Sequence, residues 1–194
     1  MGTISVGRLS VEDYLAIDRA AEVKSEYHDG EMFPMEAVRW AHSVISINVG
    51  VSLKPQLSKT QCHVAGSSIR VRVSPTKYVL PDLIVVCGKP AFTDEYQDTV
   101  TNPKVVIEIL SPSTEDYDYG KKFILYRRLP SFEEYVLVSQ EGARVEKYRK
   151  TPDDHWVLST YTGLDSVVPL ESLSVSLPLS EIYDGIEFPA AAED

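Results

Sequence analysis

Cysteine is scarce in this sequence, with only Cys62 and Cys87 among 194 residues. There is no Cys-x-x-Cys pair, and two cysteines so far apart along the chain do not make a zinc ribbon. The adjacent pair Cys62 and His63 is a poor metal site, because neighbouring residues of a strand point to opposite faces of the sheet. We therefore expect two buried thiols in a cytoplasmic protein.

Long hydrophobic runs are also missing. The nearly apolar runs, such as residues 105–110, are far shorter than the roughly 20 apolar residues that cross a bilayer. The first residues lack a basic stretch followed by an apolar one, so we expect neither a secretory signal nor a membrane protein. Glycine and proline, at 10 and 12 residues, are too few for a linker-like or collagenous chain.

Positive charge is in deficit, because 19 Lys and Arg stand against 29 Asp and Glu, a formal net charge of −10. Such a chain is not generally attracted to nucleic acid or anionic lipid, so a phosphate ligand would need a local positive patch or a metal ion. Basic residues do cluster, and the clusters could face phosphate or could be solvated strand edges. They are Arg70, Arg72 and Lys77; Lys121, Lys122, Arg127 and Arg128; and residues 144–150.

The rest of the composition, 43% hydrophobic and 25% charged, is that of an ordinary globular chain. Periodicity predicts an α/β fold in one domain over residues 1–194. Helices are predicted at residues 10–21, 42–57, 117–129 and 180–183. Strands are predicted at residues 31–38, 62–65, 68–73, 78–87, 104–110, 134–139, 144–150, 156–161 and 167–169. The last three strands should form an outer antiparallel meander, residues 90–102 a loop, and residues 190–194 a frayed end.

Two local signals are clear near the start of the chain. The segment Ser10-Val-Glu-Asp13 is typical of a capping box, with Ser10 as N-cap of the first helix. The segment His28-Asp29-Gly30 is typical of a turn.

Two carboxylates interrupt apolar runs that are typical of buried strands. Asp82 lies within residues 79–86 and Glu108 within residues 105–110. An unpaired carboxylate there would cost several kcal/mol, so each needs a partner, a raised pKa or a cation. Each could instead lie at a strand end and reach water or a backbone amide. On adjacent strands, ~4.8 Å apart, the two could share one Mg²⁺ or Mn²⁺, ions that prefer oxygen ligands.

Lys122 lies in the middle of the apolar face of the helix predicted at residues 117–129. A lysine in a packing face must either extend to solvent or meet a negative partner. One candidate partner is Asp118, one turn earlier, in a helix pair worth a few tenths of a kcal/mol. The other interpretation directs the ammonium group at the carboxylates of Asp82 and Glu108.

These residues belong to an ordered set of motifs. The set comprises Glu26-Tyr-His-Asp-Gly-Glu31, His42, Tyr78-x-x-Pro-Asp82, Ile107-Glu-Ile-Leu-Ser-Pro-Ser-Thr114, Asp118-Tyr-Gly-Lys-Lys-Phe-x-x-Tyr126 and Glu134-Tyr-Val-Leu-Val138. Pro81-Asp82 followed by Glu108 on the next predicted strand resembles the PD-(D/E)XK nuclease signature. The whole set, from about residue 10 to residue 183, resembles a large bacterial family of restriction-endonuclease-like proteins that is expanded in cyanobacteria.

The resemblance implies a restriction-endonuclease-like core over about residues 10–185, a mixed sheet flanked by helices, with extra antiparallel strands. Asp82 and Glu108 would be the metal ligands. Glu26, on or just after the first helix, matches a further acidic residue that such folds often add to the metal site.

Two further positions follow from the resemblance. The signature's lysine, two residues after Glu108, is Leu110 here, and Lys122 is the matching position on the following helix. His42 matches a family position and is a candidate catalytic residue. It could equally be a helix-start histidine that makes a cap or core hydrogen bond.

The implied activity is that of a metal-dependent endonuclease that hydrolyses DNA with Mg²⁺ or Mn²⁺. The ion would polarise the phosphate and lower the pKa of a bound water, and Lys122 would orient that water or stabilise the developing charge. Two alternatives stay open: a non-catalytic relative that acts as a binding or assembly module, and a metal-dependent hydrolase of a small phosphorylated molecule. The fold also leads us to expect a homodimer.

Overall fold

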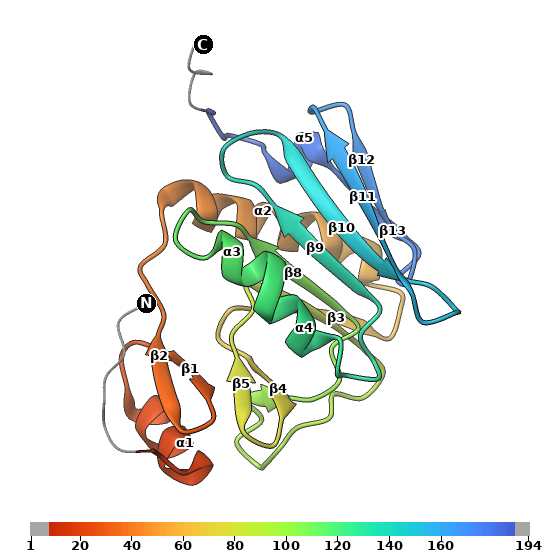
Figure 1. Cartoon of the computed structure of the whole chain (residues 1–194). Helices are drawn as coiled ribbons and strands as arrows, with labels where there is room; N and C mark the ends of the chain where they lie inside the picture. Colours follow the sequence, from red (N-terminus) through yellow and green to blue (C-terminus); the bar gives the residue numbers. More distant parts are fainter. Residues whose placement is uncertain (1–7, 189–194) are drawn as a thin grey trace.

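The computed structural model describes residues 8–188 and contains two mixed sheets, a two-stranded ribbon and helices of 3 to 18 residues (Figure 1). The helices are α1 (Val11–Ala20), α2 (Trp40–Leu57), α3 (Glu115–Tyr117), α4 (Phe123–Tyr126) and α5 (Leu179–Ile182), with a π-helical turn η1 (Asp118–Lys122) between α3 and α4. The strands are β1 (Ser25–His28), β2 (Glu31–Pro34), β3 (Cys62–Gly66), β4 (Arg70–Ser74), β5 (Lys77–Val79), β6 (Leu83–Cys87), β7 (Thr99–Val100), β8 (Val105–Ile109), β9 (Glu134–Val138), β10 (Arg144–Lys150), β11 (Trp156–Thr162), β12 (Val167–Leu170) and β13 (Val175–Pro178). The predicted α/β class with a mixed sheet is confirmed.

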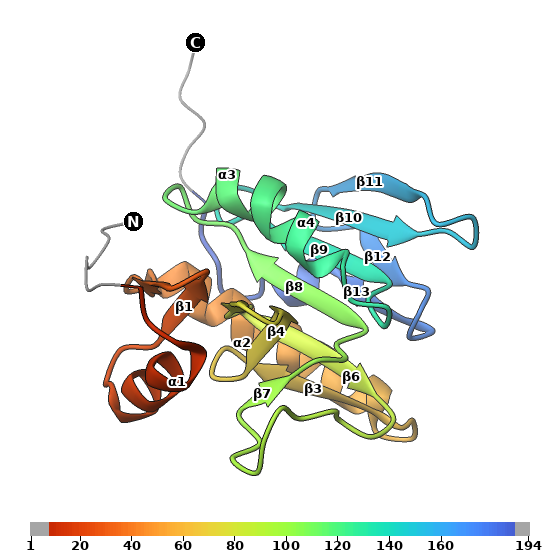
Figure 2. The ribbon, with the colours of Figure 1, turned by 60° about the horizontal axis from the view of Figure 1, so that its bottom comes forward.

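The larger sheet has the order β11-β10-β9-β8-β6-β3, and β8 runs between β6 and β9 (Figure 2). Strands β8 and β9 are parallel, and the other pairs of this sheet are antiparallel. Alternate residues of β8 face opposite sides of the larger sheet. Val105, Ile107 and Ile109 pack in the same cluster as α2, whereas Val106 packs in the cluster that contains α4. Glu108 alternates with these residues and therefore faces the α4 side.

The smaller sheet has the order β2-β1-β5-β4-β7, and the segment between β5 and β6 connects it to the larger one. The sequence predicted a single strand over residues 78–87. The structure instead breaks it at Leu80, Pro81 and Asp82, because proline has no N–H to donate to a sheet ladder. Asp82 therefore lies where the chain passes from one sheet to the other.

The β1–β2 hairpin corrects the placement of Glu26. The sequence placed this residue on or just after the first helix, but it lies on β1, a strand that was not predicted. The turn at residues 28–30 is confirmed, and Gly30 adopts φ +103°, a conformation that favours glycine. Strand β2 ends at Pro34, four residues before the predicted end.

Helical predictions are borne out in position and corrected in detail. The N-cap is confirmed, because the Ser10 hydroxyl accepts the Asp13 backbone N–H at 3.1 Å. The helix predicted at residues 117–129 ends at Tyr126 and contains the π-turn η1, whose inward side chains are Asp118 and Lys122. Such turns are rare and often occur at functional sites.

Strand pairing also differs from the sequence prediction at two places. The predicted meander holds for β10 and β11, but β12 pairs with β13, which was not predicted. The predicted loop at residues 90–102 contains the short strand β7, which pairs with β4 in parallel. Residues 190–194 lie outside the described part of the chain.

The expectation of two buried thiols is wrong. Cys62 and Cys87 are directly opposite each other on β3 and β6, and they form a disulfide. Both residues are half-buried at the edge of the larger sheet. The sequence did not predict this disulfide, because the two cysteines are 25 residues apart and come together only through the antiparallel pairing of β3 with β6.

Two of the basic residues that the sequence offered as a phosphate-facing surface are buried. Arg70, with 1% of its surface exposed, pairs with Asp18 and with Asp98 at 2.9 Å. Lys147 is buried against Glu134 at 3.6 Å. These two cations are therefore part of the core. No helix within residues 8–188 is both long and apolar enough to span a bilayer.

Candidate active site

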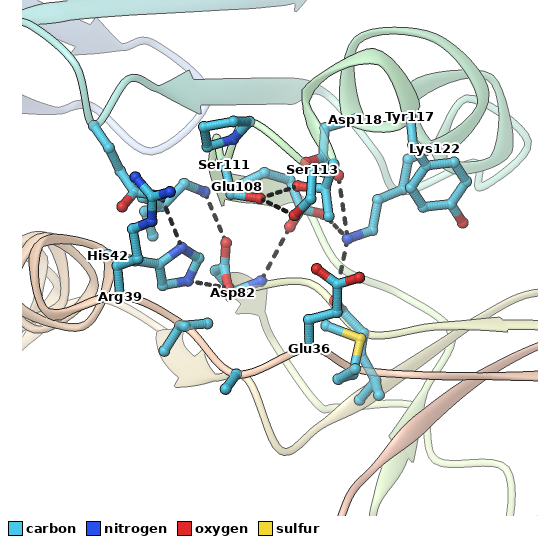
Figure 3. A pocket seen from close by; sticks show the side chains of 18 of the residues that line it. Glu36, Arg39, His42, Asp82, Glu108, Ser111, Ser113, Tyr117, Asp118 and Lys122 are labelled. Carbon is cyan, nitrogen blue, oxygen red and sulfur yellow. Dashed lines mark hydrogen bonds and ion pairs between the residues drawn. The ribbon is translucent and has the colours of Figure 1, made fainter. Parts of the chain in front are cut away.

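A pocket of about 340 Å³ forms where the start of α2, the β5–β6 connection, the end of β8 and the turn η1 meet (Figure 3). It contains all five predicted site residues, which come from five different elements or connections. They are Glu26, His42, Asp82, Glu108 and Lys122. The structure thus brings together residues separated by up to ninety-six positions in sequence, from residue 26 to residue 122.

Asp82, the residue just before β6, lies side by side with Glu108 of β8. Leu83 pairs with Ile107 in the antiparallel β6–β8 register, so the next position outward sets Asp82 opposite Glu108. The Asp82 backbone N–H donates to Glu108 Oε2 at 3.2 Å, and the Ile109 N–H donates to Asp82 Oδ2 at 2.7 Å. Each carboxylate is therefore fixed by an amide of the other strand, and both face the pocket.

Lys122 is the cation at the centre of this group. Its Nζ lies 3.0 Å from Glu108 Oε1 and 3.5 Å from both Glu26 Oε1 and Asp118 Oδ1. It also donates to the Leu80 carbonyl at 3.2 Å, and only 5% of its side chain is exposed. Both interpretations of its position are thus present, because the helix pair with Asp118 and the contact with the carboxylate group coexist.

The pKa values of the two buried acids Glu108 and Glu26 shift in opposite directions. Burial raises the pKa of Glu108 well above its ordinary value, Lys122 opposes the rise, and Asp118 and Asp82 add to it. Burial also disfavours the charge of Glu26, but Lys122 and hydrogen bonds from His28 and the Leu80 amide outweigh it, so this pKa is lowered. Burial likewise disfavours charged Lys122, but the surrounding carboxylates raise its pKa well above the ordinary value.

His42 contacts the acid pair from the other side. Its Nε2 lies 2.9 Å from Asp82 Oδ1 (Figure 3). The amide of Gln140 lies 3.4 Å from its Nδ1. The same amide donates to the Leu110 carbonyl at 2.6 Å, which ties this chain of contacts to the end of β8. The sequence did not identify Gln140, because a single polar residue after a strand carries no periodic signal.

Three further side chains complete the site. His28 and Tyr126 belong to the motif set but had no predicted role, and Tyr117 was missed. The Tyr126 hydroxyl donates to Glu108 Oε1 at 3.0 Å, and the Tyr117 hydroxyl donates to Glu26 Oε2 at 2.7 Å. His28 Nε2 lies 3.2 Å from Glu26 Oε2. Tyr126 follows Lys122 by four residues, and this helical spacing was the available signal for it.

The hydrogen bond from Tyr126 is expected to stabilise the fold. Tyr126→Phe removes the donor from buried Glu108 and should lower the free energy of unfolding by about 1–2 kcal/mol. Urea unfolding at neutral pH measures the change. Tyr148→Phe is the matched control, because its hydroxyl makes no hydrogen bond within residues 8–188. Equal decreases in the two variants would contradict the assignment.

The donor set fits a hard divalent cation. Asp82 and Glu108 offer carboxylate oxygens from one wall of the pocket, and Asp82 keeps 14% of its side chain exposed there. No group of three or more His, Cys, Asp and Glu arranged for a metal occurs in the described part of the chain. Two carboxylates nevertheless suit Mg²⁺, which usually keeps several waters and takes one or two carboxylates plus substrate phosphate oxygens.

Comparison with known proteins identifies the family. Residues 11–180 match the family model Uma2, which is described as "Putative restriction endonuclease". The chain belongs to the Uma2 family. The resemblance carried by the sequence motifs is thereby confirmed.

Relatives of this Uma2 protein come from cyanobacteria. Two are proteins of Synechocystis sp. (strain ATCC 27184 / PCC 6803 / Kazusa). "Uncharacterized protein slr1290" is 34% identical over 182 residues, 93% of this chain and 94% of the relative. "Uncharacterized protein sll1609" is 31% identical over 168 residues, 86% and 95% of the two chains.

A solved structure shares the fold. It is described as a "putative nuclease belonging to DUF820" from Anabaena variabilis ATCC 29413, and it superposes with a TM-score of 0.73 at 17% sequence identity. The match covers 90% of this chain and 97% of that one. At this identity the likeness concerns the fold, and it confirms the predicted architecture.

Proposed function

We propose that this Uma2 protein is a metal-dependent endonuclease that hydrolyses DNA phosphodiester bonds. The observation that carries the proposal is that Asp82, Glu108 and Lys122 line one pocket, where the chain passes from the smaller sheet to the larger one. Membership of a family whose description is "Putative restriction endonuclease" supports the same reaction class.

Asp82 and Glu108 are the residues that would hold Mg²⁺ or Mn²⁺. When bound, such an ion supplies a Lewis acid for the phosphate and lowers the pKa of a coordinated water. The amides of Asp82 and Ile109 keep the two carboxylates in place, so little reorganisation is needed at the moment of reaction.

Lys122 supplies a fixed positive charge beside the carboxylates. Glu26 and Asp118 hold its ammonium group, and the Tyr117 hydroxyl fixes Glu26 in turn. A preorganised cation of this kind stabilises negative charge that develops on the phosphate oxygens, or orients the attacking water. Glu26 and Tyr117 therefore act on the reaction through the position of Lys122.

His42 positions the other carboxylate. It contacts Asp82 Oδ1 through Nε2 while Gln140 contacts Nδ1, so the imidazole ring is held from both sides. This arrangement fixes the direction of the Asp82 carboxylate toward the pocket. His42 can also hold a proton at Nε2 next to the reacting group.

A cleavage assay tests the proposal. Purified protein incubated with supercoiled plasmid DNA should produce nicked or linear DNA with Mg²⁺ or Mn²⁺, and intact plasmid with EDTA. Glu108→Gln should remove this activity, while Glu31→Gln, a change of the same kind at an exposed position, should retain it.

The alternatives give different results in the same experiment. Thermal stabilisation by Mn²⁺ without DNA cleavage would favour a hydrolase of a small phosphorylated molecule. Absence of both cleavage and metal-dependent stabilisation would favour a non-catalytic binding or assembly module.

A further inference from the structure

A second pocket lies directly beside the candidate active site and shares Tyr117 with it. It measures about 430 Å³ and runs between the helical segment and the β1–β2 hairpin. We call it the side groove and define it by Tyr117, Lys121, Ile124 and Arg128 on the helical side and by His28 and Phe33 on the hairpin side.

The walls of the side groove are rings and an exposed aliphatic side chain. The ring of His28 lies edge-on to Phe33, with centroids 5.5 Å apart, and edge-on to Tyr117 at 6.2 Å. Ile124, on the opposite wall, has 56% of its surface exposed. The three rings are half-buried. Together with the exposed Ile124 side chain they form a surface suited to the flat face of a ligand.

Two cations lie along this surface without a counter-ion. Lys121 and Arg128 are exposed, and neither makes an ion pair within residues 8–188. Lys77, which also lines the groove, is instead paired with Asp29. In a chain of net charge −10, two uncompensated cations beside rings indicate an anionic ligand with a planar part.

Tyr117 connects the side groove to the site of the proposed reaction. Its hydroxyl donates to Glu26, and Lys122 Nζ lies 5.9 Å from the centre of its ring. Consecutive lysines separate the two pockets, because Lys122 points into the candidate active site and Lys121 lines the groove. Tyr117 therefore lines both pockets and forms part of the boundary between them.

We infer that the side groove binds an unpaired nucleotide of the DNA strand next to the phosphate that is cleaved. The base stacks on the ring of Phe33, and the flanking phosphates contact Lys121 and Arg128. A base inside a duplex is paired and stacked, so only an unpaired nucleotide can fill the groove without prior opening. The inference rests on the proposed function and names its substrate class, DNA with a single-stranded segment.

Binding measurements in EDTA test the charges of the groove without cleavage. Fluorescence anisotropy should show that wild type binds an oligothymidylate strand more tightly than a duplex of equal length. The double variant Lys121→Gln/Arg128→Gln should weaken binding of the strand roughly tenfold. The slope of the logarithm of the association constant against the logarithm of the salt concentration should become shallower by about 1.4, or about 0.7 for each phosphate that is no longer neutralised. The matched control Lys59→Gln/Arg127→Gln removes two exposed charges outside the groove and should bind as wild type does.

Phe33→Leu tests the stacking surface separately. It should weaken binding of the single strand by about 5- to 150-fold, because stacking on an aromatic ring contributes about 1–3 kcal/mol per base, and leave the salt slope unchanged. Phe92→Leu, at an exposed ring elsewhere, is its control.

The outcomes separate this inference from the proposed nuclease activity. Binding of the strand through the groove without cleavage in Mg²⁺ or Mn²⁺ would support the groove and overturn the nuclease. Cleavage of duplex DNA at equal rates by wild type and the groove variants would overturn the groove alone. Equal affinity of the groove variants and their controls for the strand, or no binding of the strand at all, would also overturn the groove.

Discussion

Asp82→Asn is expected to abolish DNA cleavage while leaving the protein without metal at least as stable as wild type. Asparagine has nearly the same shape and keeps an acceptor for the Ile109 N–H, but it lacks the charge that holds the ion. The decrease in rate should be about 100-fold or more, since a catalytic metal contributes several kcal/mol of charge stabilisation.

The stability part of this prediction follows from the neighbouring acids. Burial raises the pKa of Glu108, and the charges of Asp118 and Asp82 raise it further. Removing the Asp82 charge relieves the repulsion between two adjacent carboxylates, so the free energy of unfolding in EDTA should be unchanged or higher.

Thermal unfolding with and without Mn²⁺ separates metal binding from folding. The ion should raise the Tm of wild type and leave the Tm of Asp82→Asn unchanged, because a ligand stabilises only a protein that binds it. Asp116→Asn, at an exposed acid of α3, is the control and should keep both the shift and the cleavage. A full metal-dependent shift in Asp82→Asn would contradict the assignment of Asp82 as a ligand.

The site could be anticipated from sequence largely because buried charge is conspicuous. Asp82 and Glu108 stood out within apolar runs, and Lys122 stood out on the apolar face of a helix. Charge in such places requires partners, and the structure makes them partners of one another. Resemblance to a family added Glu26 and His42, which show no comparable local signal.

The connections between elements could not be predicted in the same way. Pro81 interrupts the strand, but the partner of the freed Leu80 amide is the carboxylate of Glu26 at 2.9 Å, a contact across fifty-four residues. The π-turn η1 places Asp118 and Lys122 inward together, and hydrophobic periodicity does not distinguish it from an α-helical turn. Long-range pairing and backbone irregularity are set by the assembled core, which local patterns do not encode.

Short polar contacts form the second class of features that the sequence did not reveal. Gln140 and Tyr117 acquire their contacts only when separate elements meet in the pocket. The disulfide of Cys62 and Cys87 depends in the same way on the register of β3 with β6. The expectation that this protein forms a homodimer stays a prediction.

Lys122→Met is expected to destabilise the fold strongly at neutral pH, in addition to removing any cleavage. The substitution keeps most of the side-chain stem but leaves the carboxylates of Glu26, Glu108 and Asp118 buried without their cation. Removing one partner of a buried ion pair costs about 3–5 kcal/mol. Urea unfolding of wild type and variant at neutral pH measures this difference.

The deficit of Lys122→Met should shrink as the pH falls. Burial opposes the charge of Glu26, but Lys122 and its hydrogen bonds lower its pKa, so in wild type this ionised group stabilises the fold above the ordinary value of 4.5. That stabilisation disappears as the pH falls through the lowered pKa, and protonated carboxyls no longer need a cation. The unfolding free energies of the two proteins should therefore lie closer together at a pH below 4.5 than at neutral pH. Lys121→Met, at the exposed neighbouring position, is the control and should show no pH-dependent decrease in the free energy of unfolding. If the decrease for Lys122→Met is equal at both pH values, weaker packing rather than the missing charge explains it.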